Sequence, residues 1–136
     1  METISPNNTR RWMLVDDNKE LLTMLAELVK HFTDAVIETH SSPLTALGAF
    51  GAAPEKYELV ITDYEMPGMD GVELCHKLHA ISSMQKVFLA TGSGYFSEST
   101  ARHLGFSALL HKPFPLTALS EALATVGLAN ETAAIA

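Results

Sequence analysis

The chain has 136 residues, of which 47% are hydrophobic and 18% charged, so it is long enough for one folded domain and too apolar for a disordered chain. Sixteen acidic and nine basic residues give a formal net charge of −7, which disfavours binding to nucleic acid or to an anionic membrane surface. The single cysteine, the polar first ten residues and the lack of a long apolar run predict a cytoplasmic protein without a signal peptide or membrane span.

The first half of the chain alternates two apolar segments with two amphipathic ones. Apolar runs predict strands at 12–15 and 35–37. Steps of three or four residues between apolar side chains predict helices at Leu21, Leu25, Leu28 and Phe32 and at Leu44, Leu47 and Phe50. Ser42 is the expected N-cap of the second helix and Pro43 its first residue.

The second half continues the alternation. Further strands are predicted at 59–61, 87–90 and 108–110, and several of the apolar runs are continuous, which is typical of strands buried on both faces of a parallel sheet. The third helix is expected to open near Asp70 and Gly71, and the fourth to run from Ser97 to Leu104 before Gly105. The last helix has apolar side chains at Leu116, Leu119, Leu123 and Val126, between Pro115 and Gly127.

Five strand–helix pairs in succession predict an α/β fold with a parallel sheet and right-handed crossovers. The expected organisation is a single domain over residues 11–127. Residues 1–10 and 128–136 are predicted to be tails.

Polar side chains follow four of the predicted strands. Asp16 and Asp17 follow the first, Asp63 the third, Thr91 the fourth and Lys112 the fifth. Each has an ordinary explanation taken alone, as a helix-terminal charge, a turn residue or a solvated lysine. Because ligands of open α/β sheets bind at the carboxyl ends of the strands, we expect the five side chains to form one site.

The residue types in this predicted site restrict its chemistry. Three neighbouring carboxylates repel one another unless a cation joins them, and Mg²⁺ prefers such oxygen ligands together with phosphate oxygens. A strand-end carboxylate beside a lysine and a hydroxyl is placed to attack phosphorus and form an aspartyl phosphate. The residues therefore lead to the hypothesis of an Mg²⁺-dependent phosphoryl acceptor.

Four motifs resemble those of bacterial response-regulator receiver domains. The segment 60–71, VITDYEMPGMDG, is similar to their phosphoacceptor block, and 14–18, LVDDN, to their acidic pair. The segment 89–92, LATG, resembles their switch threonine and 110–114, LHKPF, their lysine–proline turn. The resemblance covers residues 11–126, nearly the whole chain.

The resemblance implies a flavodoxin-like, three-layer α/β/α fold with five helices and a five-stranded parallel sheet in the order 2-1-3-4-5. It implies that Asp63 accepts a phosphoryl group from a phosphohistidine of a sensor kinase or phosphotransfer protein. Mg²⁺ would be held by Asp17, Asp63 and the backbone carbonyl of Glu65, with Asp16 acting through a water molecule. Thr91 and Lys112 would contact the phosphoryl group.

The resemblance has further implications for the last third of the chain. The Lys112–Pro113 peptide bond is expected to be cis. The face formed by the fourth helix, fifth strand and last helix is expected to bind a downstream partner or a second copy. Leu109 departs from the family pattern, because receivers usually carry Tyr or Phe three residues before the lysine. The usual readout through a rotating aromatic ring is therefore not expected here.

Two other functional classes compete with a signalling receiver that catalyses only its own phosphorylation and slow dephosphorylation. A phosphatase of the haloacid-dehalogenase type also uses an aspartyl phosphate, but requires an aspartate two residues after the nucleophile, where this chain has Glu65. A receiver fold that no longer takes phosphate is disfavoured by the intact set of five polar residues. A stand-alone regulator and a receiver excised from a hybrid sensor kinase both stay open.

Other reactive side chains have simpler interpretations. His76 and His79 lie three residues apart on the third helix, but no third metal ligand is evident, so a solvated face is expected. Cys75 is predicted to be a small core residue. Met66 and Met69 follow Asp63 and are expected to cover the site.

Overall fold

The computed structural model describes residues 10–128, which form five strands, five α-helices and one short 3₁₀ helix. In chain order these are β1 (Arg11–Val15), α1 (Lys19–Val29), β2 (Val36–His40), α2 (Pro43–Ala52), the 3₁₀ helix η2 (Pro54–Lys56), β3 (Tyr57–Asp63), α3 (Gly71–Ile81), β4 (Val87–Thr91), α4 (Glu98–His103), β5 (Ala108–His111) and α5 (Leu116–Thr125).

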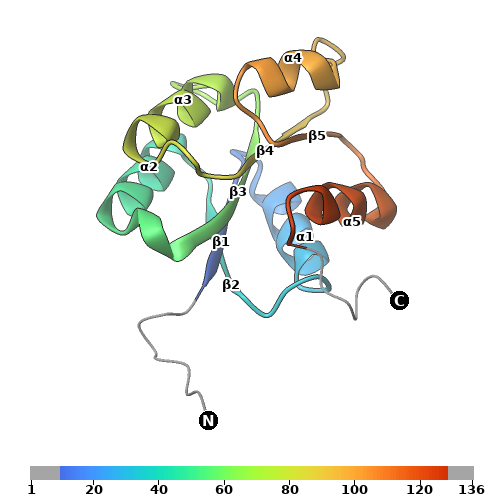
Figure 1. The fold of residues 1–136 in the computed structure, drawn as a ribbon, viewed down its shortest axis with the longest axis horizontal. Helices are drawn as coiled ribbons and strands as arrows, with labels where there is room; N and C mark the ends of the chain where they lie inside the picture. Colours follow the sequence, from blue (N-terminus) through green and yellow to red (C-terminus); the bar gives the residue numbers. More distant parts are fainter. Residues whose placement is uncertain (1–9, 129–136) are drawn as a thin grey trace.

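All neighbouring strands pair in parallel, in the order β2-β1-β3-β4-β5. Helices α1 and α5 cover one face of the sheet, and α2, α3 and α4 lie on the other (Figure 1). The predicted flavodoxin-like, three-layer fold with strand order 2-1-3-4-5 is therefore confirmed.

The sheet separates two hydrophobic cores, and alternate side chains of each strand enter opposite cores. From β1, Met13 and Val15 join the core beneath α2, α3 and α4, whereas Trp12 and Leu14 join the core beneath α1 and α5. All four are at most 1% exposed. This burial on both faces explains the continuous apolar runs of the sequence.

Three of the helices have a side-chain N-cap at the position where the sequence predicts that the helix begins. Ser42 accepts a hydrogen bond from the backbone of α2, Asp70 from α3 and Ser97 from α4. Gly105 and Gly127 follow α4 and α5 with φ angles of 107° and 77°, a conformation that glycine adopts without strain.

The edge strand β2 is longer than predicted, extending to His40 rather than ending at residue 37. Its last residues, 38–40, are polar, so the apolar pattern of the sequence did not predict them as part of a strand. The Glu38 carboxylate accepts hydrogen bonds from the Arg11 guanidinium at 2.9 Å and from the Tyr57 hydroxyl at 2.8 Å. These partners come from β1 and β3, so the extension depends on tertiary contacts. The 3₁₀ helix Pro54–Lys56 was likewise not predicted.

The end of the sheet where β1 begins is held by charged contacts. Arg10 forms ion pairs with Asp34 at 2.7 Å and Glu58 at 3.1 Å, and the Trp12 indole N–H donates to Glu58 at 2.8 Å.

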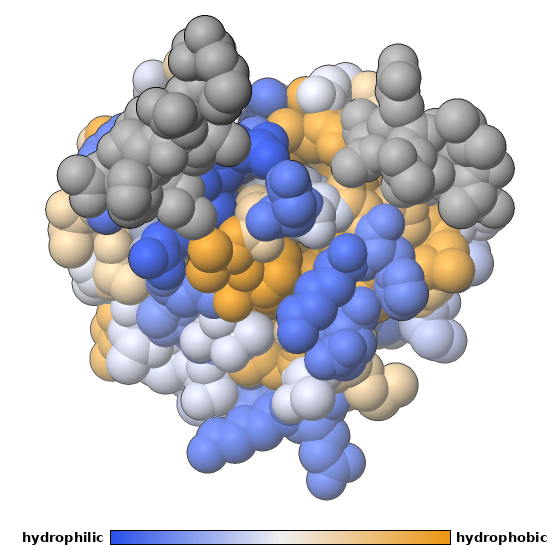
Figure 2. All heavy atoms as spheres, turned by 90° about the horizontal axis from the view of Figure 1, so that it is seen from below, coloured by the Kyte–Doolittle hydropathy of each residue, from blue (hydrophilic) through white to orange (hydrophobic). Residues whose placement is uncertain are grey.

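Seen from below the view of Figure 1, hydrophobic side chains gather near the centre of the surface with hydrophilic ones around them (Figure 2). No helix within residues 10–128 is long and apolar enough to cross a membrane.

Candidate functional site

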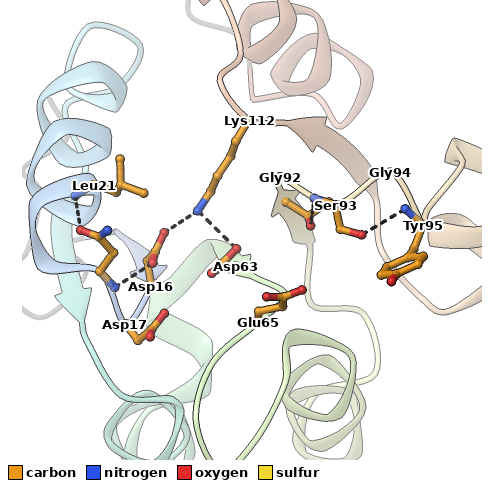
Figure 3. Close-up of a pocket in the computed structure, with 12 residues that line it drawn as sticks. Asp16, Asp17, Leu21, Asp63, Glu65, Gly92, Ser93, Gly94, Tyr95 and Lys112 are labelled. Carbon is orange, nitrogen blue, oxygen red and sulfur yellow. Dashed lines mark hydrogen bonds and ion pairs between the residues drawn. The ribbon is translucent and has the colours of Figure 1, made fainter.

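The carboxyl ends of β1, β3, β4 and β5 meet at one edge of the sheet, where their polar side chains line a pocket of about 860 Å³ (Figure 3). The pocket brings together every residue that the sequence predicts for the site: Asp16, Asp17, Asp63, Glu65, Thr91 and Lys112. It opens beside helix α1 on one side and the β4–α4 loop on the other.

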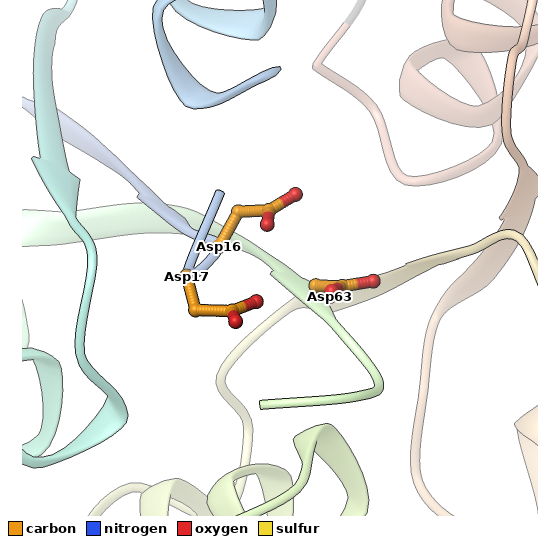
Figure 4. A group of neighbouring side chains, drawn as sticks. All are labelled: Asp16, Asp17 and Asp63. Atoms are coloured by element: carbon orange, nitrogen blue, oxygen red, sulfur yellow. The ribbon is translucent and has the colours of Figure 1, made fainter. Parts of the chain in front are cut away.

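Three carboxylates converge in this pocket. One oxygen of each of Asp16, Asp17 and Asp63 lies within 4.8 Å of the others (Figure 4). Asp16 is only 3% exposed, Asp63 is partly buried and Asp17 is open to solvent. Three like charges at this spacing need a neutralising cation.

Lys112 supplies one positive charge inside the pocket. Its ammonium Nζ lies 2.6 Å from Asp16 Oδ2 and 3.2 Å from Asp63 Oδ1. The backbone N–H of Lys112 donates to the Thr91 carbonyl at 2.8 Å, which fixes the root of the side chain against β4. The Lys112–Pro113 bond is cis, as predicted.

The site perturbs the protonation of both partners of the longer ion pair. Burial raises the pKa of Asp63 and the Asp16 charge adds to this effect, although the nearby Lys112 ammonium opposes it. Burial by itself would lower the pKa of Lys112, but its hydrogen bond to Asp16 and the charges of Asp63 and Asp16 raise that pKa overall. The lysine is therefore held as a cation between two carboxylates.

Backbone contacts hold Asp16 in place. Its own N–H donates to the His40 carbonyl at 3.1 Å, and its Oδ1 accepts the Asn18 N–H at 2.9 Å. Asn18 in turn is the N-cap of α1, accepting the Leu21 N–H at 3.1 Å. The start of α1 and the buried carboxylate are thus organised together.

Thr91 presents its hydroxyl from the end of β4 and is 1% exposed. Its Oγ1 accepts the Ser93 N–H at 3.0 Å, so the hydroxyl is tied to the following loop. Leu21, Ser93 and the 82%-exposed Tyr95 also line the pocket. Sequence reasoning missed these three, although the position of Ser93 and Tyr95 just after a strand end was a usable signal.

Gly71 positions α3 against the site. A Cβ atom at Gly71 would overlap the Asp63 carbonyl oxygen, and the Gly71 N–H donates to the Tyr64 carbonyl at 2.8 Å. Only a residue without a side chain allows the first turn of α3 to approach the end of β3 this closely. This role of Gly71 was not predicted.

The arrangement fits Mg²⁺. The three converging carboxylates offer hard oxygen ligands, and the solvent-open side of the pocket leaves room for water or phosphate oxygens. The Glu65 side chain also lines the pocket. The pocket is therefore acidic and can hold a metal ion.

Two expectations about neighbouring residues were right only in part. His76 is exposed, as predicted, but His79 is partly buried: its Nε2 lies 2.8 Å from the Gln85 carbonyl and its Nδ1 3.7 Å from the Cys75 sulfur. Met66 and Met69 are buried in the core with α3, and neither lines the pocket that contains Asp63, although Met66 lines a second hollow together with Asp17 and Glu65. Cys75 is a buried core residue, as predicted, and burial raises its pKa to about 11.

The fold and pocket together define a doubly wound α/β protein with an acidic site at the carboxyl edge of its sheet. Known proteins agree with this definition. The model of the response regulator receiver domain family matches residues 13–124. The transcriptional regulatory protein FixJ of Azorhizobium caulinodans is 32% identical over 87% of this chain and 56% of its own length. A response regulator receiver protein of Anaeromyxobacter sp. is 32% identical over 76% of this chain and 43% of its length.

Solved structures share the same fold. A receiver domain protein from Clostridium thermocellum superposes with a TM-score of 0.77 at 22% identity, covering 93% of this chain and 99% of that one. The CheX–CheY–BeF₃–Mg²⁺ complex of Borrelia burgdorferi gives a TM-score of 0.77 at 18% identity, covering 86% and 88% of the two chains. The chain belongs to the response regulator receiver domain family of two-component signalling proteins. It spans about half the length of the two curated relatives named above.

Proposed function

We propose that this receiver accepts a phosphoryl group on Asp63. The observation that carries the proposal is the position of the Asp63 carboxylate, which is partly buried beside the Lys112 ammonium and two further carboxylates in an open pocket. A nucleophile at such a place is reachable by a donor from solvent and has cationic support close by.

The proposed reaction transfers the phosphoryl group from a histidine imidazole of the donor to the Asp63 carboxylate. An Asp63 carboxylate oxygen attacks phosphorus, the new O–P bond forms, and the P–N bond to the donor imidazole breaks with its electron pair returning to the ring. The Lys112 ammonium compensates the charge of the phosphoryl oxygens, and the Thr91 hydroxyl donates to one of them. Mg²⁺, held by Asp17, Asp63 and the Glu65 carbonyl, would supply further neutralisation, with Asp16 acting through water.

The donor we propose is the phosphohistidine of a sensor kinase or a phosphotransfer protein. The family membership supports this choice, and the Borrelia relative, solved with BeF₃ and Mg²⁺, supports a site for phosphoryl mimic and metal in this fold. We propose that the chain works in signalling in the cytoplasm. Phosphatase catalysis of the haloacid-dehalogenase type is disfavoured, because position 65, two residues after Asp63, is Glu rather than Asp. The proposal applies equally to a stand-alone regulator and to a receiver within a longer protein, such as a hybrid sensor kinase.

The output surface we propose is the face of α4, β5 and α5. Its exposed side chains on α4 are polar, among them Glu98, Arg102 and His103. The chain does not bind nucleic acid in this proposal, since its net charge of −7 opposes phosphate backbones. Leu116 at the start of α5 is 50% exposed, so the proposed face offers both polar and apolar contacts to a downstream partner or a second copy of the chain.

The test is phosphorylation by a small phosphodonor, acetyl phosphate, with Mg²⁺. Intact-mass spectrometry should show a single gain of about 80 Da in the wild type, the mass of one phosphoryl group. Asp63→Asn should show none. The matched control is Asp34→Asn, the same change at an exposed residue beyond the other end of the sheet. A full gain of mass in Asp63→Asn would show that another residue is the acceptor.

A further inference from the structure

An aromatic contact joins the residue after Asp63 to the loop that leads from Thr91 to α4. The rings of Tyr64 and Phe96 meet edge to face, with centroids 4.8 Å apart and planes at 73°. Both rings are half-buried and pack on the same hydrophobic core. Edge-to-face contacts at this separation are favourable, so the ring pair holds the segment after β3 against the loop before α4.

The loop between Thr91 and Phe96 is also tied to the pocket at its other end. Thr91 Oγ1 accepts the Ser93 N–H at 3.0 Å, and Ser93 Oγ accepts the Tyr95 N–H at 3.1 Å. A hydroxyl can donate one hydrogen bond while it accepts another. Through these two bonds, a displacement of the Thr91 hydroxyl would be passed to the backbone of Ser93 and on to Tyr95.

Phe96 stands directly before α4. Ser97 is the N-cap of this helix, accepting the Thr100 N–H at 3.1 Å. The residue before an N-cap, when hydrophobic, fixes the angle at which the chain enters the helix. The place where the Phe96 ring is anchored therefore determines where α4 starts.

We propose that the Tyr64–Phe96 contact couples occupation of the Asp63 pocket to the position of α4. Tyr64 is joined by a peptide bond to Asp63, and Phe96 to the N-cap of α4, so their ring contact links the acceptor residue to the start of the helix. Leu109 offers no ring for this purpose: it is 7% exposed and packs in the same core as Ala101 of α4. Tyr64 and Phe96 are positioning residues, and their role rests on the proposed phosphorylation of Asp63.

The proposed coupling compares the protein with an empty and with an occupied Asp63 pocket, so the experiment records the change between these two states. Amide chemical shifts are recorded with Mg²⁺, before and after addition of beryllofluoride, a phosphoryl mimic. In the wild type we expect changes both around Asp63 and in α4 (98–103). Phe96→Ala and Tyr64→Leu should keep the changes around Asp63 and lose most of those in α4. Phe96→Tyr, which retains the ring, should restore them.

The matched control is Met84→Ala, which removes a large, 87%-exposed side chain that lies outside the pocket and should behave as the wild type. If Phe96→Ala and Tyr64→Leu, or whichever of them folds, keep the full response of α4, the coupling proposal is wrong and the phosphoacceptor proposal stands. If the wild type responds around Asp63 but not in α4, the coupling proposal is again wrong. If nothing changes in the wild type around Asp63, both proposals fail.

Discussion

The Lys112 ammonium is shared unequally between two carboxylates, lying closer to Asp16 than to Asp63. Asp16 uses both oxygens within the protein, since Oδ1 accepts the Asn18 N–H and Oδ2 receives the lysine. Asp17 is exposed at the rim of the same pocket, and its carboxylate has solvent around it. At the scale of single residues, the two adjacent aspartates therefore have different capacities to bind a metal.

We expect Asp17→Asn to weaken Mg²⁺ binding by about tenfold or more, and Asp16→Asn to weaken it less. A directly ligating carboxylate loses its bond to the ion when it is neutralised, whereas Asp16 already has two partners inside the protein. Isothermal titration calorimetry with MgCl₂ measures both affinities. Asp70→Asn, which keeps an N-cap and lies outside the acidic trio, is the control. Equal losses at Asp16 and Asp17 would contradict the ranking.

At the scale of elements, the site depends on how closely α3 approaches β3. The close contact is between Gly71, the first residue of α3, and the Asp63 carbonyl at the end of β3. A second glycine, Gly48, lies within α2 and a Cβ atom there would meet nothing within 4 Å. Comparing alanine substitutions at Gly71 and Gly48 therefore separates the free-energy cost of a steric overlap from the ordinary effect of replacing glycine in a helix.

Gly71→Ala should lower the free energy of unfolding by about 1–3 kcal/mol, because the new methyl group overlaps backbone that cannot move aside. Gly48→Ala should raise it by about 0.5–1 kcal/mol, since alanine has less backbone freedom to lose in a helix. Urea denaturation followed by circular dichroism measures both. Gly71→Ala with wild-type stability would mean that α3 can shift without cost.

At the scale of the whole molecule, a polar network beneath α2 joins the edge strand to the rest of the sheet. Glu38 of β2 accepts a hydrogen bond from Arg11 of β1 at Oε1 and from Tyr57 of β3 at Oε2, and the His40 Nε2 lies 2.8 Å from that same Oε2. Burial by itself would raise the pKa of Glu38, but the hydrogen bonds and charges of His40, Tyr57 and Arg11 lower it overall. Burial and the Glu38 charge raise the pKa of Tyr57 to about 12.

A lowered pKa in the folded state means that ionised Glu38 stabilises the fold above its usual pKa of 4.5, and that this stabilisation is lost as the pH falls through the folded value. Glu38→Gln should therefore lower the free energy of unfolding at neutral pH by about 1.5–3 kcal/mol, the range for hydrogen bonds to charged groups. The difference from wild type should shrink in acid. Urea denaturation at both pH values measures it, with exposed Glu55→Gln as the control. A difference that does not change with pH would exclude the ionised network as its source.

The pattern of the sequence alone predicted the succession of strands and helices and the polar residues that meet at the strand ends, whereas the strand order came from the family resemblance. Apolar runs buried on both faces and amphipathic segments between them follow directly from the 2.0 and 3.6 residue periods of strands and helices. Because parallel strands end at one edge, residues that follow separate strands, such as Asp16, Asp63 and Lys112, were predicted to meet, and the pocket contains all of them.

Only the tertiary structure decided which neighbours each side chain contacts. Three contacts join segments far apart in the chain: the ion pair of Lys112 with Asp16, the hydrogen bond of Tyr57 to Glu38 and the ring contact of Tyr64 with Phe96. Periodicity reports which face of an element a residue occupies, but not what packs against that face. Contacts of this kind depend on distances between elements, which are determined by the packing of the whole core.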